Sequence, residues 1–364
     1  MDKQSHLLVC ISAHGFGHVA QTAPIINELH ARLPNVRITV RSMVRLEYLR
    51  SRIHAPFDRV GDSGDASDIG MLMSSALDVD AEASADAYRA FHRDWEASVM
   101  HEAAALRELK PDFVLANVGY LPLAGAHHAG IPCAAMSSLN WADIFAHYCG
   151  RLAGGRQVIA QMGDSYGGAG AFLRLTPGMP MDERYHPHEI GPVADVGRFR
   201  RDEINARLNL TPDRKVVLVS LGGVAGRLPT DRWPRLPGVS WLVPASWRST
   251  HPDACTLESL GMPFGDILAS IDTLICKPGY GSFVEAACSG VPVLYSRRDD
   301  WPETAVLAAW LDRHAACREV SRTALEEGGF AEVLQLLLVR PRPQPVAPAG
   351  IVEAADWLQA RLGF

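Results

Sequence analysis

The sequence predicts an α/β protein made of two doubly wound domains with parallel sheets. Short runs of apolar residues alternate with helical patterns, which is typical of strands that are buried on both faces. This alternation starts twice, before and after a break rich in proline and charge at residues 179–198. A chain of 364 residues also suits two hydrophobic cores better than one.

In the first half, strands are expected at residues 6–13, 36–42, 112–118 and 132–138. A long helical pattern runs through residues 87–110. Proline is tolerated only in the first turn of a helix, so Pro24 predicts that the first helix begins between Gln21 and Ala23. Residues 60–70, which are rich in Asp, Ser and Gly, are expected to form a solvated loop or a lid.

In the second half, strands are expected at residues 216–223, 239–244, 273–279 and 291–296. The segment VRPRPQPVAPAG is a proline-rich linker that leads into a final amphipathic helix. The predicted organisation has four parts: an N-terminal Rossmann-like domain at 1–185, an interdomain linker at 186–200, a C-terminal domain at 201–340, and a linker with a C-terminal helix at 341–364. This last helix is expected to pack back on the N-terminal domain.

The composition excludes several classes of protein. A formal charge of −6 argues against nucleic acid as a partner, because binding to phosphates needs a basic face. No apolar run approaches the roughly 18 to 20 residues that cross a bilayer, and the N-terminus lacks the pattern of a signal peptide. Seven scattered cysteines without a CxxC pair are typical of reduced thiols, so we expect a cytoplasmic protein. The pairs His127-His128 and His186-x-His188 lack cysteine partners at finger-like spacing, so no metal site is expected.

Each half carries a glycine turn after its first strand. The first turn, HGFGH, contains His14, Gly15, Gly17 and His18, and the second contains Gly222 and Gly223. Neither turn is the GxGxxG fingerprint of dinucleotide-binding proteins. Glycine is favoured in any tight turn between a strand and a helix, so these turns alone are weak indications of function.

A stronger indication is ICKPGYGSFVEAACSGVPVLYSRRDDWPE at residues 275–303. It predicts a strand, a turn in which Gly279 and Gly281 allow the backbone close to a ligand, a helix and the next strand. The free N–H groups and the dipole of that helix favour an anion at its N-terminus. Lys277 adds a positive charge beside the turn, so the segment predicts a site for a nucleoside diphosphate.

Two residues of this segment, Glu285 and Arg298, have two interpretations each. Ser282 is expected to cap the helix, and Glu285 lies three residues later, at the spacing of a capping box. The carboxylate of Glu285 is equally suited to accept hydrogen bonds from the vicinal hydroxyls of a ribose. Arg298 either contacts phosphate or covers the edge of the domain.

With HGFGH, SSLNWADIFAHY at 137–148, the LGG turn and KPGYGS to RRDDWPE, the chain resembles the GT-B glycosyltransferases. This superfamily includes MurG-type N-acetylglucosaminyltransferases and UDP-glycosyltransferases. The closest likeness is to the glycosyltransferase-like N-terminal region of plant L-arabinokinases, without their kinase domain. The resemblance implies two Rossmann-like domains with a ligand cleft between them. It also implies that a sugar moves from a nucleotide-diphosphate sugar, a UDP-sugar, to an acceptor hydroxyl with inversion and without a metal or a resident cofactor.

The resemblance also implies roles for single residues. His18 stands where many inverting members have the base that deprotonates the acceptor. Asn117 stands where the relatives have an Asp that orients this base, so His18 would be a weaker base or His14 would share its task. Glu285 would hold the ribose, and Glu303 the hydroxyls of the donor sugar. The implied donor-binding residues are Gly15, Gly17, Gly222, Gly223, Phe264, Lys277, Gly279, Tyr280, Gly281, Ser282, Glu285, Arg298 and Glu303.

Two alternatives stay open. A GT-B nucleotide-sugar epimerase would need several carboxylates around the sugar, and only the RRDDWPE group offers them. A nucleotide-sugar-binding protein without catalysis is favoured by Asn117. The acceptor is not predicted, and a peripheral association with the inner membrane of the MurG kind stays open beside the cytoplasmic location. Trp141 and Phe145 are interpreted as core residues rather than as a platform for the acceptor.

Overall fold

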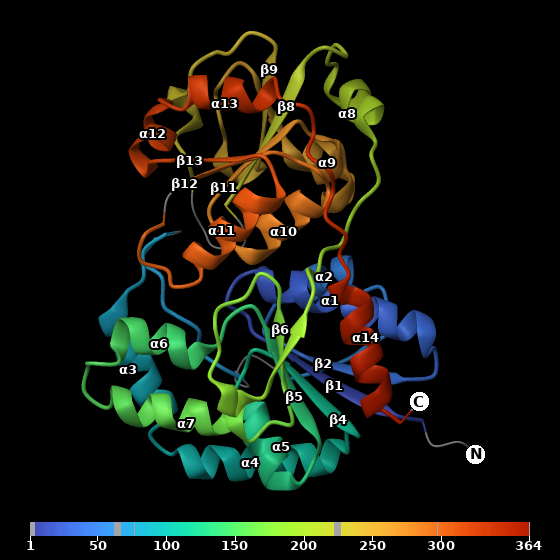
Figure 1. Ribbon diagram of the computed structural model, residues 1–364, viewed down its shortest axis with the longest axis vertical. Coiled ribbons are helices and arrows are strands. Elements are labelled where there is room, and N and C mark those ends of the chain that lie inside the picture. The colour runs from blue at the N-terminus through green and yellow to red at the C-terminus, as the bar shows by residue number, and fades with distance from the viewer. Residues whose placement is uncertain (1–3, 62–66, 76, 222–226, 297, 364) are drawn as a thin grey trace. The chain divides into compact units, whose positions relative to one another are not determined.

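The computed structural model describes residues 4–61, 67–75, 77–221, 227–296 and 298–363 (Figure 1). The chain divides into two compact units. The first unit comprises Met1–Ser74, Asp78–Val193 and Ala349–Phe364, and the second comprises Ser75–Leu77 and Ala194–Pro348. Each unit is an α/β structure around one parallel sheet, as the sequence predicts.

The sheet of the first unit has the strand order β3-β2-β1-β4-β5-β6-β7, and every neighbouring pair is parallel. Its strands are β1 (His6–Ile11), β2 (Arg37–Arg41), β3 (Asp58–Val60), β4 (Phe113–Asn117), β5 (Cys133–Ser137), β6 (Phe172–Leu175) and β7 (Pro187–Ile190). The four strands predicted in this half correspond to β1, β2, β4 and β5. The segment predicted as the interdomain linker contains β7, and the first unit continues to Val193.

The helices of the first unit are α1 (Gly17–Arg32), α2 (Leu46–Arg52), α3 (Ala81–Phe91), α4 (Trp95–Leu109), α5 (Leu121–Ala129), α6 (Trp141–Cys149), α7 (Gly155–Gly167) and α14 (Gly350–Arg361). The single long helix predicted at residues 87–110 is two helices, because the chain breaks between Phe91 and Trp95. None of the described helices is both long and apolar enough to span a membrane.

The prediction that the first helix begins between Gln21 and Ala23 is wrong. Helix α1 begins at Gly17, and Pro24 lies inside it. Proline in a helix interior removes one backbone hydrogen bond, here the bond to the carbonyl of Ala20. Every residue from His18 to Ile26 is buried, so packing of this helix outweighs the lost bond.

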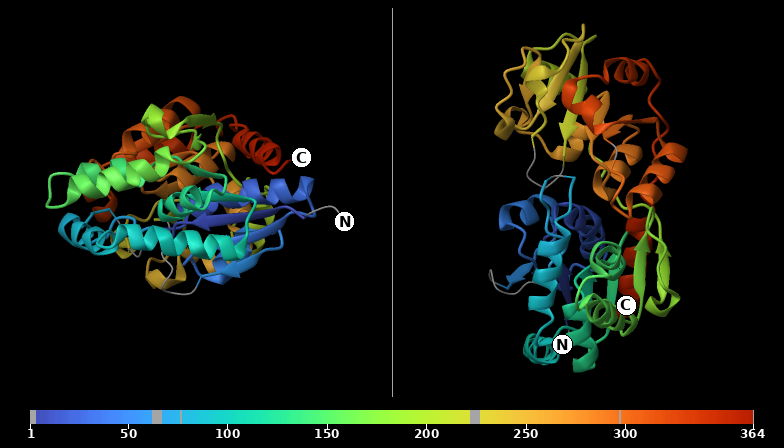
Figure 2. Two further views of the ribbon diagram at one scale, coloured as in Figure 1. Left: turned by 90° about the horizontal axis from the view of Figure 1, so that it is seen from below. Right: turned by 90° about the vertical axis from the view of Figure 1, so that its left-hand side faces the viewer.

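The C-terminal helix α14 belongs to the first unit. It lies beside α1 (Figure 1) and beside β7 (Figure 2). Its first residue, Gly350, donates its N–H to the carbonyl of Pro192 at 3.0 Å. The guanidinium of Arg32 on α1 pairs with the carboxylate of Asp356 on α14.

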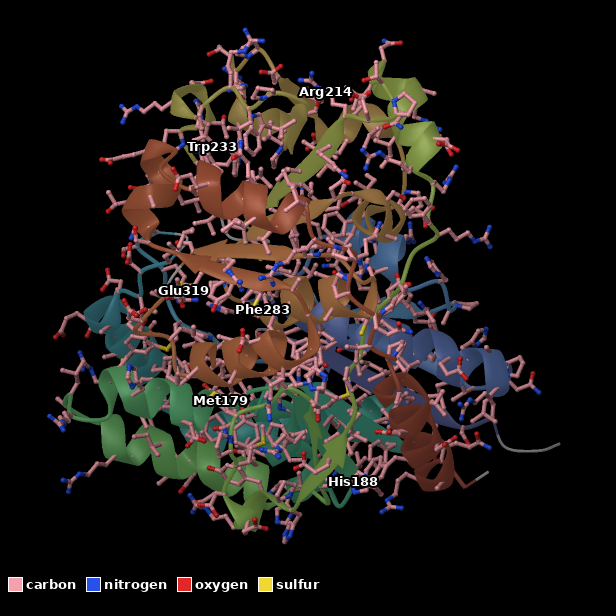
Figure 3. The ribbon with its side chains drawn as sticks, turned by 45° about the horizontal axis from the view of Figure 1, so that its top comes forward. Met179, His188, Arg214, Trp233, Phe283 and Glu319 are labelled. Atoms are coloured by element: carbon pink, nitrogen blue, oxygen red, sulfur yellow. The ribbon has the colours of Figure 1, made fainter. Side chains whose placement is uncertain are left out.

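The sheet of the second unit has the strand order β10-β9-β8-β11-β12-β13, again with parallel neighbours. Its strands are β8 (Lys215–Ser220), β9 (Val239–Val243), β10 (Ala254–Thr256), β11 (Thr273–Cys276), β12 (Val293–Ser296) and β13 (Cys317–Val320). Its helices are α8 (Arg201–Leu208), α9 (Phe264–Ser270), α10 (Tyr280–Cys288), α11 (Thr304–His314), α12 (Arg322–Glu327) and α13 (Ala331–Leu338). Trp233, labelled in Figure 3, packs edge-on against Trp241 and Phe330 in the core of this unit, with ring centroids 5.0 and 4.9 Å apart.

Both sheets have the same order of strands relative to the chain. In each, the first strand of the unit lies in the interior, and the chain adds strands first to one side and then to the other. The order reverses between β1 and β4 in the first sheet and between β8 and β11 in the second. In sheets of this kind, ligands bind beyond the carboxyl ends of the strands at this switch point. The topology therefore directs attention to the segments after β1, β4, β8 and β11.

Candidate functional site

His18 and Asn117 lie at the switch point of the first sheet. Asn117 is the last residue of β4 and pairs in register with Ile11, the last residue of β1. The turn after β1 contains Gly15, whose φ of +81° is a conformation that glycine favours. Helix α1 follows at once, so His18 is its second residue rather than a residue of the preceding turn.

A hydrogen-bond network fixes the tautomer of His18. The hydroxyl of Thr22 donates to the carbonyl of His18 at 2.8 Å, so its oxygen accepts from Nδ2 of Asn117 at 3.0 Å. The same Nδ2 donates to Oε1 of Gln21 at 3.0 Å. Oδ1 of Asn117 is therefore the atom that faces Nδ1 of His18, at 2.8 Å, and it accepts the proton of that nitrogen. Nε2 is left as the unprotonated ring nitrogen, and among the described residues nothing hydrogen-bonds to it.

The surroundings of His18 keep its ring neutral. Burial lowers the pKa of His18 to about 4, and the hydrogen bond to Asn117 opposes this shift only in part. The N-terminal turn of α1 adds a positive dipole end, which also disfavours an imidazolium. Asn117 thus performs one of the two tasks of a carboxylate partner: it orients the ring but supplies no charge.

The side chain of Trp141, at the start of α6, packs against both histidines of the HGFGH turn. Its ring centroid lies 5.8 Å from that of His18 and 5.1 Å from that of His14, the latter pair being edge-on. Trp141 is 0% exposed and Phe145 is 1% exposed. The interpretation of these two aromatic residues as core is confirmed.

Asp68 belongs to this site, although it lies in the segment expected to be a solvated loop. Residues 62–66 of that segment lie outside the described residues, but Asp68 is 8% exposed. Its Oδ1 accepts from the hydroxyl of Ser12 at 3.0 Å, and its Oδ2 accepts from Nε1 of Trp141 at 3.1 Å. Burial raises the pKa of Asp68 to about 6, while the two hydrogen bonds lower it. For Asp68, the expectation of a solvated position is therefore wrong.

In the second unit, the predicted cap of the donor-site helix is wrong. Helix α10 begins at Tyr280 with Gly279 as its N-cap, and no side chain caps it. Ser282 therefore lies inside the first turn. Glu285 lies one turn further on and is buried, so a capping box does not explain it. The helix starts earlier than predicted because the chain turns back directly at the end of β11, and its first turn follows Gly279.

Two cations lie together beside this helix. Lys277 follows β11 and Arg298 follows β12, and these strands are neighbours. Burial, and next the charge of Arg298, lower the pKa of Lys277 to about 8. Arg298 is buried, with its guanidinium 4.3 Å above the ring of Trp301 and 3.8 Å from Oδ1 of Asp300. Two cations held this close beside a helix N-terminus favour a polyanion.

Two further residues predicted for the donor site, Glu303 and Phe264, lie at the N-terminal ends of helices. Glu303 is buried at the N-cap of α11, where its carboxylate accepts from Nε1 of Trp301 at 3.3 Å. Phe264 is the first residue of α9 and not part of a loop. Helix α9 leads into β11, so this end lies at the carboxyl edge of the sheet. Gly222 and Gly223 lie outside the described residues.

Several residues of the site were not predicted from the sequence. Gln21 and Thr22 follow His18 by three and four residues, which places all three on one face of α1. This spacing would have found them if the helix had been expected to begin at Gly17. Asp68 is joined to the site only through contacts that no local pattern indicates. Trp301 lies within the RRDDWPE motif, but its contacts with Arg298 and Glu303 were not predicted.

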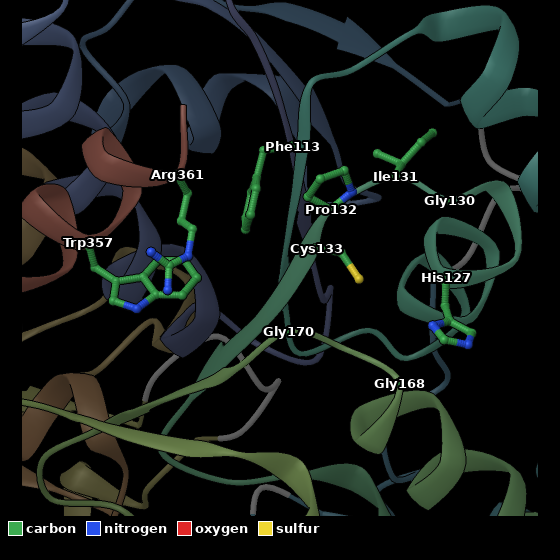
Figure 4. Close-up of a pocket in the computed structure, with 10 residues that line it drawn as sticks. All are labelled: Phe113, His127, Gly130, Ile131, Pro132, Cys133, Gly168, Gly170, Trp357 and Arg361. Atoms are coloured by element: carbon green, nitrogen blue, oxygen red, sulfur yellow. The ribbon is translucent and has the colours of Figure 1, made fainter. Parts of the chain in front are cut away.

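A cavity of about 340 Å³ opens at the other edge of the first sheet (Figure 4). It is lined by the residues that begin or precede β4, β5 and β6, with His127 of α5 on one side and Trp357 and Arg361 of α14 on the other. This edge carries the amino ends of the strands, so the cavity is not part of the candidate site. Within the described ranges, no group of three or more His, Cys, Asp or Glu side chains is placed to hold a metal ion.

The two parallel sheets, in each of which the order of strands reverses at a switch point, give the chain the GT-B fold, as the resemblance implied. The chain superimposes on the calicheamicin glycosyltransferase CalG4 with a TM-score of 0.65 and 18% identity over 99% of both chains. Arabidopsis thaliana UGT89C1 in complex with quercetin gives a TM-score of 0.60 and 15% identity over 100% of both chains.

Relatives are also found by sequence, although no family model matches the chain. The chain is 26% identical over 338 residues to the L-arabinokinase of Arabidopsis thaliana, which covers 89% of this chain and 31% of the relative. It is 27% identical over 211 residues to the UDP-N-acetylglucosamine–N-acetylmuramyl-(pentapeptide) pyrophosphoryl-undecaprenol N-acetylglucosamine transferase of Thermus thermophilus, which covers 54% of this chain and 57% of the relative. The chain thus spans less than two thirds of either relative.

Proposed function

We propose that the chain is a glycosyltransferase that moves a sugar from a UDP-sugar to an acceptor hydroxyl with inversion. The observation that carries this proposal is the locked tautomer of His18, whose Nε2 is unprotonated at the switch point of the first sheet. The GT-B fold supports it, and so do two proteins to which the chain is similar. The Thermus thermophilus relative is by name a transferase acting from UDP-N-acetylglucosamine, and UGT89C1 has also been solved with UDP-L-rhamnose.

In this reaction, Nε2 of His18 takes the proton of the acceptor hydroxyl. The acceptor oxygen forms its bond to the anomeric carbon as the bond from that carbon to the phosphate oxygen breaks on the opposite face. Nδ1–H of His18 stays bonded to Oδ1 of Asn117 throughout, so the ring does not rotate away from the acceptor. A positioned base of this kind contributes roughly 10²- to 10⁴-fold to the rate.

The leaving diphosphate needs positive charge where its negative charge develops. The N–H groups at the start of α10 and the cations Lys277 and Arg298 are suited to that task, without a metal ion. Glu285 would accept hydrogen bonds from the ribose and Glu303 from the donor sugar.

Ligand-induced stabilisation tests the donor half of the proposal. The protein and its Glu285→Gln variant are compared by thermal shift and calorimetry against UDP-, GDP-, TDP- and CMP-sugars. A ligand at a hundred times its Kd adds about 2.7 kcal/mol of stability. Saturable stabilisation by UDP-sugars that weakens in Glu285→Gln supports the proposal, and the absence of any response to all four classes refutes it.

A second candidate is a nucleotide-sugar-binding protein without transfer activity. The observation in its favour is the neutral partner of His18 together with a pKa of about 4, which makes the imidazole a weak base. Turnover separates the candidates. The transferase consumes UDP-sugar, by transfer or by slow hydrolysis, and His18→Ala binds the donor normally but loses this turnover. A binding protein shows equal and negligible turnover with and without His18.

A further inference from the structure

Asp68 is held in place at both of its oxygens. Ser12, in the turn after β1, donates to Oδ1 at 3.0 Å, and the indole N–H of Trp141 on α6 donates to Oδ2 at 3.1 Å. The Trp141 contact joins residues that are 73 positions apart in the chain. Such a carboxylate, buried and fixed by two donors, holds its charge at one defined place.

The same indole contacts both Asp68 and the ring of His18. The N–H of Trp141 donates to the carboxylate of Asp68, and the centroid of the indole ring lies 5.8 Å from that of His18 at an interplanar angle of 59°. A cation over the face of a Trp ring, within about 6 Å of its centroid, is attracted to the π electrons. A carboxylate that accepts from the indole N–H increases the electron density of the ring and so strengthens this attraction.

We propose that Asp68 is a positioning residue that acts through Trp141 to stabilise the imidazolium formed on His18. It supplies the negative charge that Asn117 cannot supply. The inference rests on the proposed function, in which Nε2 of His18 takes the proton of the acceptor. That proton stays on His18 during the attack, and Asp68 remains a carboxylate throughout, so no proton crosses the indole.

The other groups around Asp68 do not compete for this role. Its electrostatic neighbours are the hydroxyls of Tyr88, Tyr120 and Tyr166 and the thiol of Cys10. Burial raises the pKa of each of these groups, so they are neutral at pH 7. Asp68 itself, with a pKa of about 6, is mostly ionised at that pH.

NMR of selectively labelled protein tests the coupling without any turnover. In the wild type, the ring nitrogens of His18 and Nε1 of Trp141 are expected to shift together between pH 5 and 7, with the midpoint of Asp68. In Asp68→Asn this common shift disappears. Asp68→Asn is isosteric, and the Ser12 hydroxyl can rotate to accept from the new amide, so the fold is expected to persist. Asp143→Asn removes a carboxylate from the same helix as Trp141 and serves as the matched control, with the shift retained.

Kinetics then test the effect on the reaction. We expect Asp68→Asn to lower kcat by about three- to thirty-fold at pH 7, with the KM for the donor unchanged. The acid limb of the kcat profile is expected near pH 6 in the wild type and near pH 4 in the variant, where His18 titrates. Trp141→Phe, which keeps a ring but loses the N–H, should resemble Asp68→Asn.

The outcomes separate the two proposals. If the His18 resonances do not follow Asp68, the coupling is refuted, whatever the activity. If they follow it but His18→Ala transfers sugar normally, the coupling stands as a property of the fold, whereas the role of His18 as the base and the stabilising role of Asp68 in the reaction are both refuted. A uniform loss of kcat at all pH values in Asp68→Asn, with the acid limb unmoved, would mean a purely structural role for Asp68.

Discussion

Replacement of Asn117 by Asp tests the central geometry of the site. The substitution gives His18 the charged partner that it lacks, at the same position and with nearly the same shape. A carboxylate partner typically changes the pKa of a neighbouring group by one to three units, so we expect the pKa of His18 to rise from about 4 to about 6. A more basic His18 would also increase kcat, if it is the base.

The cost of this substitution follows from the network around Asn117. Its Nδ2 donates to Gln21 and Thr22 at 3.0 Å each, and a carboxylate oxygen in its place would face two acceptors. Gln21 can reverse its amide, because its other contacts, Ser137 and Ser138, are hydroxyls that rotate. The hydroxyl of Thr22 can donate to the new carboxylate only if it gives up its hydrogen bond to the carbonyl of His18. One buried hydrogen bond is lost, so we expect Asn117→Asp to be less stable by about 1 to 3 kcal/mol at pH 7.

Two measurements check this prediction: urea unfolding at pH 7, and titration of His18 by NMR. Thr22→Val is the matched control, since it removes the same hydroxyl without adding a charge, and it should lose stability without raising the pKa of His18. A folded Asn117→Asp protein whose His18 still titrates near pH 4 would refute the reasoning. It would mean that the side chain at position 117 does not contact Nδ1.

Three further predictions concern other parts of the molecule. Burial and the charge of Arg298 hold the pKa of Lys277 near 8, so the affinity for UDP should fall as pH rises above 8. Calorimetry should find no such fall in Lys277→Met, and in Lys277→Arg the midpoint of the fall should move to higher pH. Pro24→Ala restores the N–H for the carbonyl of Ala20 inside α1, so urea unfolding should show a gain of about 1 to 2 kcal/mol, and a loss would mean that packing of the ring outweighs the bond. Arg41 and Glu102 form a buried ion pair, so Glu102→Gln should lower the free energy of unfolding in urea by about 3 to 5 kcal/mol. A decrease below about 1 kcal/mol would show that the pair is solvated.

The sheets were largely predictable from the sequence because their central strands are buried on both faces. Apolar runs such as that of β1, all of whose residues are buried, have no counterpart in loops. The strands that were missed are short and lie toward the edges of the sheets. In β3 no residue is fully buried, and β7 has one buried residue, so neither has an apolar pattern to recognise.

Helix starts were predicted too late in both units, for one physical reason. The prediction used residue preferences, with Pro24 in a first turn and Ser282 as a cap. Helices α1 and α10 instead begin directly after the glycine turns of the two switch points, without side-chain caps. The N-terminal turn of a helix without a side-chain cap is a favourable place for an anionic ligand. The position of Asp68 was not predictable, because it depends on contact with a residue 73 positions away.

Asp68 and His18 make opposite contributions to the response of the first unit to acid. Burial raises the pKa of Asp68 from 3.8 to about 6, so its contribution to stability falls as pH rises through this interval. Burial lowers the pKa of His18 from 6.5 to about 4, so its contribution rises with pH over nearly the same interval. Each contribution amounts to about 3 kcal/mol, and their signs are opposite, so they cancel over most of the range. The fold can therefore hold both groups in their reactive forms above pH 6, one ionised and one neutral, without becoming acid-labile through them. When either group alone is removed, the free energy of unfolding depends on pH through the other group, because nothing then offsets that contribution.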